Sequence, residues 1–188
     1  MAQKVKLNNV RVAFAHDLWV ASNKSDDKNA APKYGCTFLI DPADPQVKAV
    51  NTAIEGAAQD KWGAKAATVL KGLRATEKAS LRDGDLKTYA GYAGNLYVSA
   101  SNTMRPTIID KDKTQLVQAD GKPYSGCFVN ASVEFWAYDH PKGGKGISCT
   151  VLGVQFNGDG EKFGSGSGVA SEDEFDDVSQ GAEAEDLA

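Results

Sequence analysis

Cysteine and histidine are scarce in this sequence, and their placement argues against metal and disulfide chemistry. The three cysteines, Cys36, Cys127 and Cys149, are an odd number and lie far apart inside apolar, strand-like runs. We therefore expect reduced thiols in a core rather than a disulfide framework. The two histidines, His16 and His140, are also far apart, and the sequence contains no C-x-x-C or H-x-x-x-H pair. These spacings predict no zinc site.

Long apolar runs are absent as well. No segment approaches the roughly 18–20 apolar residues that a membrane-spanning helix needs. The N-terminal segment is polar and leads directly into an alternating pattern, so we expect no signal peptide. Apolar residues nevertheless make up 41% of the 188 residues. This composition predicts a cytosolic chain with no membrane partner and a real core in a single domain.

Two segments resemble ligand-binding motifs but depart from them at decisive positions. The segment 110–121 begins like a calcium loop, but its sixth position is Gln115 instead of glycine and its twelfth is Gly121 instead of glutamate. The segment 142–146 is rich in glycine, yet a predicted strand follows it, so no helix N-terminus is available for a phosphate. The sequence thus predicts no catalytic residue, no metal and no cofactor.

Charge is distributed very unevenly along the chain. The whole chain has a net charge of -4, but residues 171–188 contain eight acidic residues and no basic one. The remaining 17 acidic residues face 21 lysines and arginines, so residues 1–170 have a net charge of +4 and the tail has -8. A mildly basic domain therefore carries its own polyanion.

The hydropathy pattern predicts a mainly β fold with an early helix. Asp44 as N-cap and Pro45 in the first turn predict a helix that ends at Gly63, and a second helix is expected over 64–73. The pair Asn8 and Asn9 interrupts the first strand and predicts a bulge. Turns are expected at 82–85 and 111–113, and a loop at 22–33. Strands are predicted at 4–14, 34–40, 96–101, 106–110, 126–138 and 146–156.

This set of elements matches a five- to six-stranded OB-type barrel with one or two inserted helices, and a β-sandwich is the main alternative. A Gly/Ser segment at 164–168 predicts a flexible linker, and the acidic tail beyond it has too little apolar surface to offset its ordering entropy. We therefore predict an OB-fold domain over 1–160, and a flexible linker with a disordered acidic tail over 161–188.

The strand at 126–138 separates two kinds of side chain by period-two alternation. One face is apolar throughout and is expected in the core: Cys127, Val129, Ala131, Val133, Phe135 and Ala137. The opposite face mixes polar groups with large rings: Phe128, Asn130, Ser132, Glu134, Trp136 and Tyr138. The strand at 96–101 repeats the pattern, with Leu96, Val98 and Ala100 inward and Tyr97, Ser99 and Ser101 outward.

Exposed rings on a half-solvated sheet offer flat surfaces on which bases stack. We therefore predict that Tyr97, Phe128, Trp136 and Tyr138 bind single-stranded DNA. The cations expected to follow its phosphates are Arg11, Lys33, Arg105, Lys122 and Lys145. The alternative is that each ring is covered by the helix or a loop and has only a packing role.

Several segments resemble a bacteriophage family of single-stranded DNA-binding proteins with an OB fold, once catalogued as a domain of unknown function. The resemblance covers about residues 5–160 and is most specific in the Tyr-Ser-Gly-Cys and Asn-Ala-Ser run of 124–132. It also includes 97–102, 105–106, 136–138 and 145–156. The family implies an OB barrel with a helical insertion, single-strand binding with little sequence preference, and an acidic tail used in replication.

The resulting hypothesis is a non-enzymatic protein that coats single-stranded DNA during phage replication or recombination in the host cytoplasm. Its tail competes with DNA and recruits replication proteins, with Phe175 as the anchor. The tail residues predicted to bind partners are Glu172, Asp173, Glu174, Phe175, Asp176 and Asp177. Two alternatives are a phage structural or protein-interaction module and a nuclease. Whether the chain forms a homo-oligomer stays open.

Overall fold

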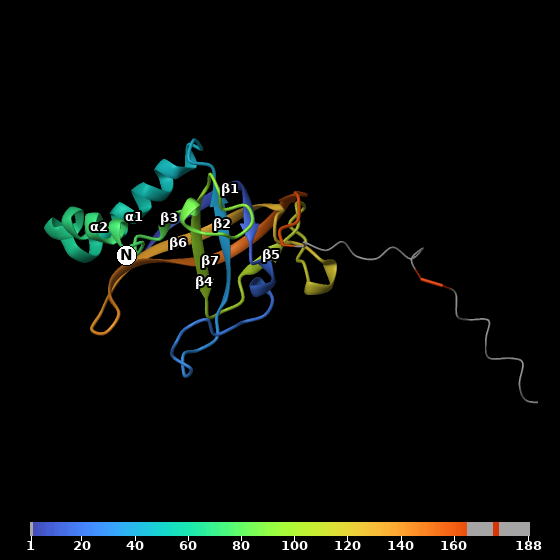
Figure 1. The fold of residues 1–188 in the computed structure, drawn as a ribbon, viewed down its shortest axis with the longest axis horizontal. Helices are drawn as coiled ribbons and strands as arrows, with labels where there is room; N and C mark the ends of the chain where they lie inside the picture. The colour runs from blue at the N-terminus through green and yellow to red at the C-terminus, as the bar shows by residue number, and fades with distance from the viewer. Residues whose placement is uncertain (1, 165–174, 177–188) are drawn as a thin grey trace, which may run out of the picture.

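The computed structural model describes residues 2–164 and 175–176, and its centre is a closed β-barrel (Figure 1). The sheet order is β3-β4-β2-β1-β6-β7-β5. An additional pairing between β4 and β7 closes five strands, β4, β2, β1, β6 and β7, into a barrel. This closure confirms the OB-type barrel and excludes the sandwich. The strands are β1 (Gln3–Ala13), β2 (Tyr34–Ile40), β3 (Leu81–Asp83), β4 (Leu96–Asn102), β5 (Thr107–Ile109), β6 (Phe128–His140) and β7 (Gly144–Gly158).

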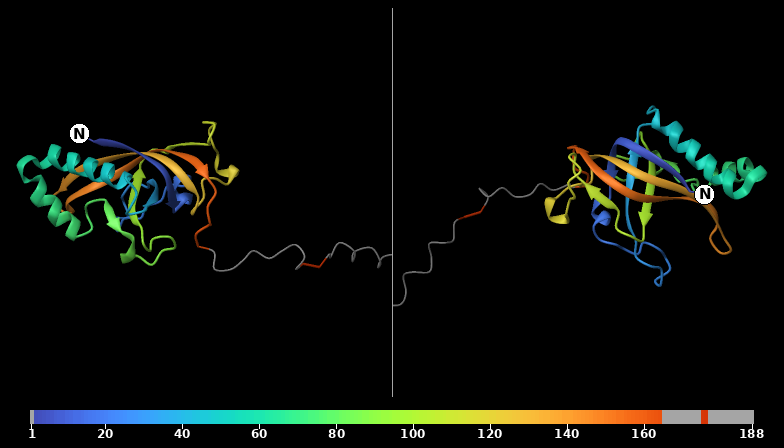
Figure 2. Two further views of the ribbon diagram at one scale, coloured as in Figure 1. Left: turned by 90° about the horizontal axis from the view of Figure 1, so that it is seen from above. Right: turned by 180° about the vertical axis from the view of Figure 1, so that it is seen from behind.

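Two helices follow β2 and lie at one end of the barrel (Figures 1 and 2). Helix α1 (Gln46–Trp62) begins one residue later than predicted, because Pro45 rather than Asp44 is its N-cap, and the Asp44 carboxylate accepts the backbone N–H of Gln46 at 2.9 Å. It ends at Gly63, whose φ of +51° suits glycine. Helix α2 (Ala66–Ala75) starts two residues later than expected, after the 3-10 turn Gly63–Lys65.

Helix α1 buries one face in the barrel core. Val50 and Ile54 are buried in the same cluster as Phe38 and Phe135 of the barrel strands. The Gln46 side chain also pairs with the edge of β1: its Oε1 accepts the Asn8 N–H at 2.5 Å and its Nε2 donates to the Asn8 carbonyl at 2.8 Å. The helix thereby protects a strand edge that would otherwise be available for pairing.

The strand faces follow the predicted alternation. Cys127, Val129, Ala131, Val133 and Phe135 are buried, whereas the alternate positions of β6 are half-buried or exposed. The expected bulge of β1 is also present, as a register shift against β6 between Leu7 and Val10. All three cysteines are free and buried, and burial raises the pKa of the Cys127 thiol to about 11.

Some segments differ from the sequence prediction. Residues 82–83, expected in a turn at 82–85, instead belong to the short strand β3, because Leu81–Asp83 pair with Tyr97 and its neighbours in β4. The hairpin between β6 and β7 is tighter than expected, and its strands extend to His140 and Gly144. No helix in the described part of the chain is long and apolar enough to cross a membrane.

The chain continues to contact the barrel after β7 ends. Phe163 donates its backbone N–H to the Ser125 carbonyl at 3.0 Å, three residues past the boundary predicted near 160. We call residues 159–163 the C-terminal strap; they continue from the end of β7 (Figure 2). The predicted Gly/Ser linker and most of the acidic tail lie outside the described residues.

Candidate nucleic-acid interface

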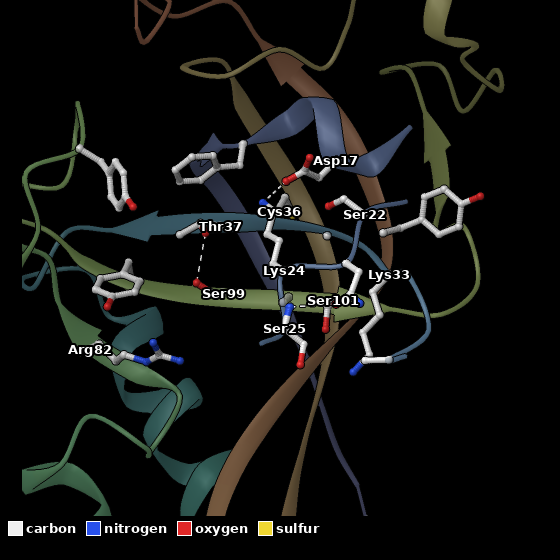
Figure 3. A pocket seen from close by; sticks show the side chains of 18 of the residues that line it. Asp17, Ser22, Lys24, Ser25, Lys33, Cys36, Thr37, Arg82, Ser99 and Ser101 are labelled. Carbon is white, nitrogen blue, oxygen red and sulfur yellow. Dashed lines mark hydrogen bonds and ion pairs between the residues drawn. The ribbon is translucent and has the colours of Figure 1, made fainter. Parts of the chain in front are cut away.

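An open groove of about 760 Å³ runs over β2 and β4 (Figure 3). One wall comes from the end of β1 and the loop 22–33, and the other from the segment 82–92 that precedes β4. The floor carries hydroxyl groups, because Thr37 and Ser99 face each other in register across β2 and β4. Their oxygens lie 3.2 Å apart.

Four aromatic rings form a continuous row along the groove, which we call the aromatic ladder: Phe14, Tyr89, Tyr92 and Tyr97. Successive ring centroids are 5.2, 5.3 and 5.0 Å apart, and the Phe14–Tyr89 contact is edge-on at 88°. Phe14 and Tyr89 are 39% and 56% exposed, whereas Tyr92 and Tyr97 are buried. Phe14 therefore contacts Tyr89, and Tyr89 in turn packs on the buried Tyr92.

Phe14 has an unusual backbone conformation that places its ring in the groove. Its φ of +56° lies in the left-handed region, which costs a non-glycine residue of the order of 1 kcal/mol or more. The chain just after Phe14 is held, since the Ala15 N–H donates to Ser125 Oγ at 3.0 Å and the Asp17 N–H donates to the Phe14 carbonyl at 3.2 Å. Strain of this kind is typical of functional positions.

Cations flank the aromatic ladder at both ends. Lys24 Nζ lies 5.2 Å from the Phe14 ring centroid and forms an ion pair with Asp17. Arg82 Cζ lies 5.5 Å from the Tyr97 ring centroid. Lys33 and Lys87 also line the groove and are exposed. Four cations thus face one carboxylate in the groove lining, which gives the groove a positive charge.

Two polar atoms of the groove lack partners. Arg82 Nε and Tyr97 Oη are buried, and neither has a hydrogen-bond partner among the described residues. A buried donor without a partner costs about 1–3 kcal/mol, so each such atom calls for an explanation, and a bound ion or ligand group is one. A phosphate oxygen is a suitable acceptor for both.

The sequence matches a family of known proteins over almost its whole length. Residues 3–188 match the family described as "Enterobacter phage Enc34, ssDNA-binding protein". The chain belongs to this family. A protein of Acyrthosiphon pisum secondary endosymbiont phage 1, named "Putative protein p50", is 45% identical over 188 residues, covering 98% of this chain and 99% of that protein.

Solved structures of phage proteins share the fold. The single-stranded DNA-binding protein from bacteriophage Enc34, with a C-terminal truncation, matches with a TM-score of 0.70 and 24% identity over 86% of this chain and 88% of that one. The same phage protein in complex with ssDNA gives 0.68 and 22%, over 86% and 90%. gp2.5, a single-stranded DNA-binding protein encoded by bacteriophage T7, gives 0.53 and 12%, over 91% and 100%.

Three of the residues that strand alternation and charge predict to bind DNA lie in or beside the groove. Lys33 lines it, and Arg105 Cζ lies 5.5 Å from the ring centroid of Tyr34, which also lines it. Tyr97 points to the predicted outer face, but its expected exposure is wrong. The ring is 2% exposed because Tyr92, from the preceding loop, packs over it.

Arg11, Lys122 and Phe128 lie outside the groove lining and are engaged with other groups. Arg11 Nε donates to the Gly126 carbonyl at 3.0 Å, and its Nη2 donates to the Glu161 carbonyl at 2.6 Å. The Phe128 ring lies 5.8 Å from the Arg11 guanidinium. Lys122 forms an ion pair with Asp110 at 2.7 Å, which raises the pKa of Lys122 and lowers that of Asp110.

Trp136, Tyr138 and Lys145 lie on the β6–β7 hairpin, outside the groove lining. Trp136 is 40% exposed as expected, and its Nε1 donates to Thr150 Oγ1 at 3.0 Å. The Tyr138 ring centroid is 5.9 Å from that of Trp136, and Lys145 forms an ion pair with Asp139. The hairpin therefore presents rings on a separate surface, and its contact with DNA stays a prediction.

Sequence reasoning missed most of the groove. The overlooked residues are Phe14, Lys24, Tyr34, Arg82, Lys87, Tyr89 and Tyr92. A signal was present in the segment 82–97, where two basic residues and three tyrosines are interspersed with glycines. Of the predicted tail residues, Phe175 is 71% exposed and Asp176 is exposed, whereas the other four lie outside the described residues.

Proposed function

We propose that this protein binds single-stranded DNA in the groove over β2 and β4, with little sequence preference. The observation that carries the proposal is the aromatic ladder: its exposed member Phe14 lies beside Lys24, its exposed member Tyr89 contacts Phe14, and Lys33 lines the same groove. We further propose a binding rather than catalytic role in phage DNA replication or recombination, in the host cytoplasm.

Stacking supplies the sequence-independent part of the affinity. Every base has a flat π surface, and each base stacked on an aromatic side chain contributes about 1–3 kcal/mol. Tyr92 contacts the exposed Tyr89 ring at a centroid separation of 5.3 Å, and Tyr97 contacts Tyr92 at 5.0 Å. Little ring motion is then lost on binding, which favours affinity.

Phosphate neutralisation supplies the second part. Lys24, Lys33, Arg82 and Lys87 line the groove, and we propose that they replace counterions along the DNA backbone. Each phosphate contact to a single strand adds about 0.7 to the salt slope of binding. The affinity is therefore expected to fall steeply as salt rises.

The acidic tail is proposed to compete with DNA for the groove and to recruit replication proteins once DNA displaces it. Its net charge of -8 opposes the +4 of residues 1–170. Phe175 is 71% exposed, as an anchor for a partner pocket should be. We propose that residues 1–160, extended by the strap, form the binding domain.

Substitution of the exposed rings tests the groove. We expect Phe14→Ala and Tyr89→Ala each to weaken binding of labelled oligo(dT) by about 1–2 kcal/mol, roughly 5- to 30-fold in Kd, because each removes a stacking surface. Fluorescence anisotropy at low salt measures the change. Trp136→Ala is the matched control, since Trp136 is as exposed as Phe14 but lies on the hairpin.

Two results would contradict this assignment. If Trp136→Ala weakens binding and the two groove variants do not, DNA lies on the β6–β7 hairpin. If the wild-type chain fails to bind oligo(dT) at low salt even after residues 171–188 are deleted, single-strand binding itself is wrong.

A further inference from the structure

The C-terminal strap joins the barrel to the loop that carries the aromatic ladder. After β7 ends at Gly158, residues 159–163 turn back over the start of β6, and Phe163 reaches the loop 87–95. Phe163 packs against a small cluster, separate from the main core, that contains Leu39, Tyr92 and Tyr97. A segment outside the barrel strands thus packs against the cluster that holds both buried rings of the ladder.

Two glycines allow the strap to lie close against the barrel. A Cβ on Gly126 would stand 2.0 Å from the Glu161 carbonyl oxygen, and one on Gly160 would stand 2.2 Å from the Gly126 carbonyl oxygen. Gly126 also has a φ of +105°, which side-chain-bearing residues rarely adopt. The two backbones therefore approach at a distance that only glycine permits.

Arg11 fastens the strap from the barrel side. Its guanidinium donates to the carbonyls of Gly126 and Glu161, one on each side of the junction. The same guanidinium lies 4.2 Å from the Phe163 ring centroid, within cation–π range. The hydrogen bonds and ring contact of Arg11 are therefore made within the protein, so Arg11 is not free to bind a phosphate.

Phe163 occupies the space next to Gly91 in the loop 87–95. Gly91 has a φ of +81°, and a Cβ there would stand 2.3 Å from the tip of the Phe163 ring. Tyr89 lies two residues before this glycine and Tyr92 lies one residue after it. The ring thus supports the loop from beneath at the point where the ladder is attached.

We propose that Phe163, fastened by Arg11, is a positioning residue for DNA binding: it holds the loop 87–95 so that Tyr89 presents its ring to the groove. Phe163 itself does not line the groove. The expected effect of Phe163 on DNA affinity rests on the proposed function. The expected effect of Phe163 on the loop 87–95 does not depend on that function.

The test compares Phe163→Ala with the wild type in the full-length chain. Hydrogen exchange should accelerate at the amides of Tyr92, Gly94 and Asn95, which are bonded within the loop region, and stay unchanged in the β6–β7 hairpin. If the loop is correctly placed in only about a tenth of molecules, the Kd for oligo(dT) rises about tenfold. Lys162→Ala, an exposed neighbour in the strap, is the control.

The salt dependence separates positioning from phosphate contact. Arg11→Ala should weaken oligo(dT) binding with an unchanged salt slope, whereas Lys33→Ala should reduce the slope by about 0.7, the value of one phosphate contact. Phe163→Leu keeps the apolar bulk and should restore most of the affinity. Gly91→Ala forces a Cβ into the ring and should accelerate the same amides, providing a second variant if Phe163→Ala fails to fold.

Unchanged exchange over 87–95 in the variants would overturn the proposal, as would a lower salt slope in Arg11→Ala. If the wild type does not bind oligo(dT), the proposed function fails, and the exchange comparison still decides whether the strap holds the loop.

Discussion

At the scale of single residues, Arg82 is the groove cation whose surroundings point most directly to a bound anion. Its Nε is buried without a partner among the described residues, and Tyr97 Oη beside it is in the same state. Hydrogen bonds to charged groups contribute about 1.5–3 kcal/mol. A phosphate here would satisfy donors that the folded chain leaves unpaired.

We therefore expect Arg82→Gln to raise the Kd for oligo(dT) about tenfold, equivalent to about 1.4 kcal/mol, and to reduce the salt slope by about 0.7. Anisotropy titrations at several salt concentrations measure both quantities. Arg74→Gln is the control, because Arg74 is 47% exposed on α2 and pairs with Glu55. Equal effects of the two substitutions would show that only net charge matters.

Residue patterns predicted which face a side chain occupies, but not what covers that face. Tyr97 lies on the side of β4 that alternation assigns, yet Tyr92 from a loop buries it. Arg11 alternates outward as a DNA cation would, but residues 115 and 150 positions later supply the carbonyls that bind it. Such long-range partners leave no trace in local spacing.

At the scale of elements, α1 shows how local signals and packing agree. Asp44 and Pro45 start the helix, and apolar residues four apart bury it on the barrel. We expect Ile54→Ala, at a site 1% exposed, to lower the free energy of unfolding by about 2–5 kcal/mol through lost burial and a residual cavity. Urea unfolding followed by circular dichroism measures the loss.

Thr52→Ala on the exposed face of α1 is the matched control and should change the free energy of unfolding by less than about 0.5 kcal/mol. A similar loss in both variants would mean that α1 does not dock on the barrel as described. Helix α1 was predictable because its signals are local, whereas β3 was not, because three residues become a strand only through pairing with β4.

At the scale of the whole molecule, charge divides the chain into a basic body and an acidic tail. We expect deletion of residues 171–188 to tighten oligo(dT) binding about 2- to 10-fold at low salt, because a flexibly tethered competitor acts at a millimolar effective concentration. The gain should vanish at high salt, where surface charges are screened. Anisotropy titrations of the full-length chain and the deletion variant with oligo(dT), at low and high salt, measure the two affinities.

A full-length chain whose eight tail acids are replaced by Asn and Gln separates charge from length. It should bind as tightly as the deletion variant, whereas equal affinity of all three chains would contradict competition by the tail. Charge asymmetry and the barrel class were both readable in the sequence. The groove was not, because it assembles the end of β1 with two loops that are brought together only when the barrel closes.

The barrel closes through a short parallel junction, where Ser101 pairs with Thr150 and the Asn102 amide donates to the Val151 carbonyl at 2.9 Å. Two antiparallel pairs of the barrel meet over longer registers: β2 and β4 do so from Tyr34 to Ile40, and β6 and β7 along most of their length. Ala100 and Val151, which flank the junction, are buried in the core. Since β4 both borders this junction and floors the groove, the contact that closes the barrel also sets where a nucleotide chain finds its floor.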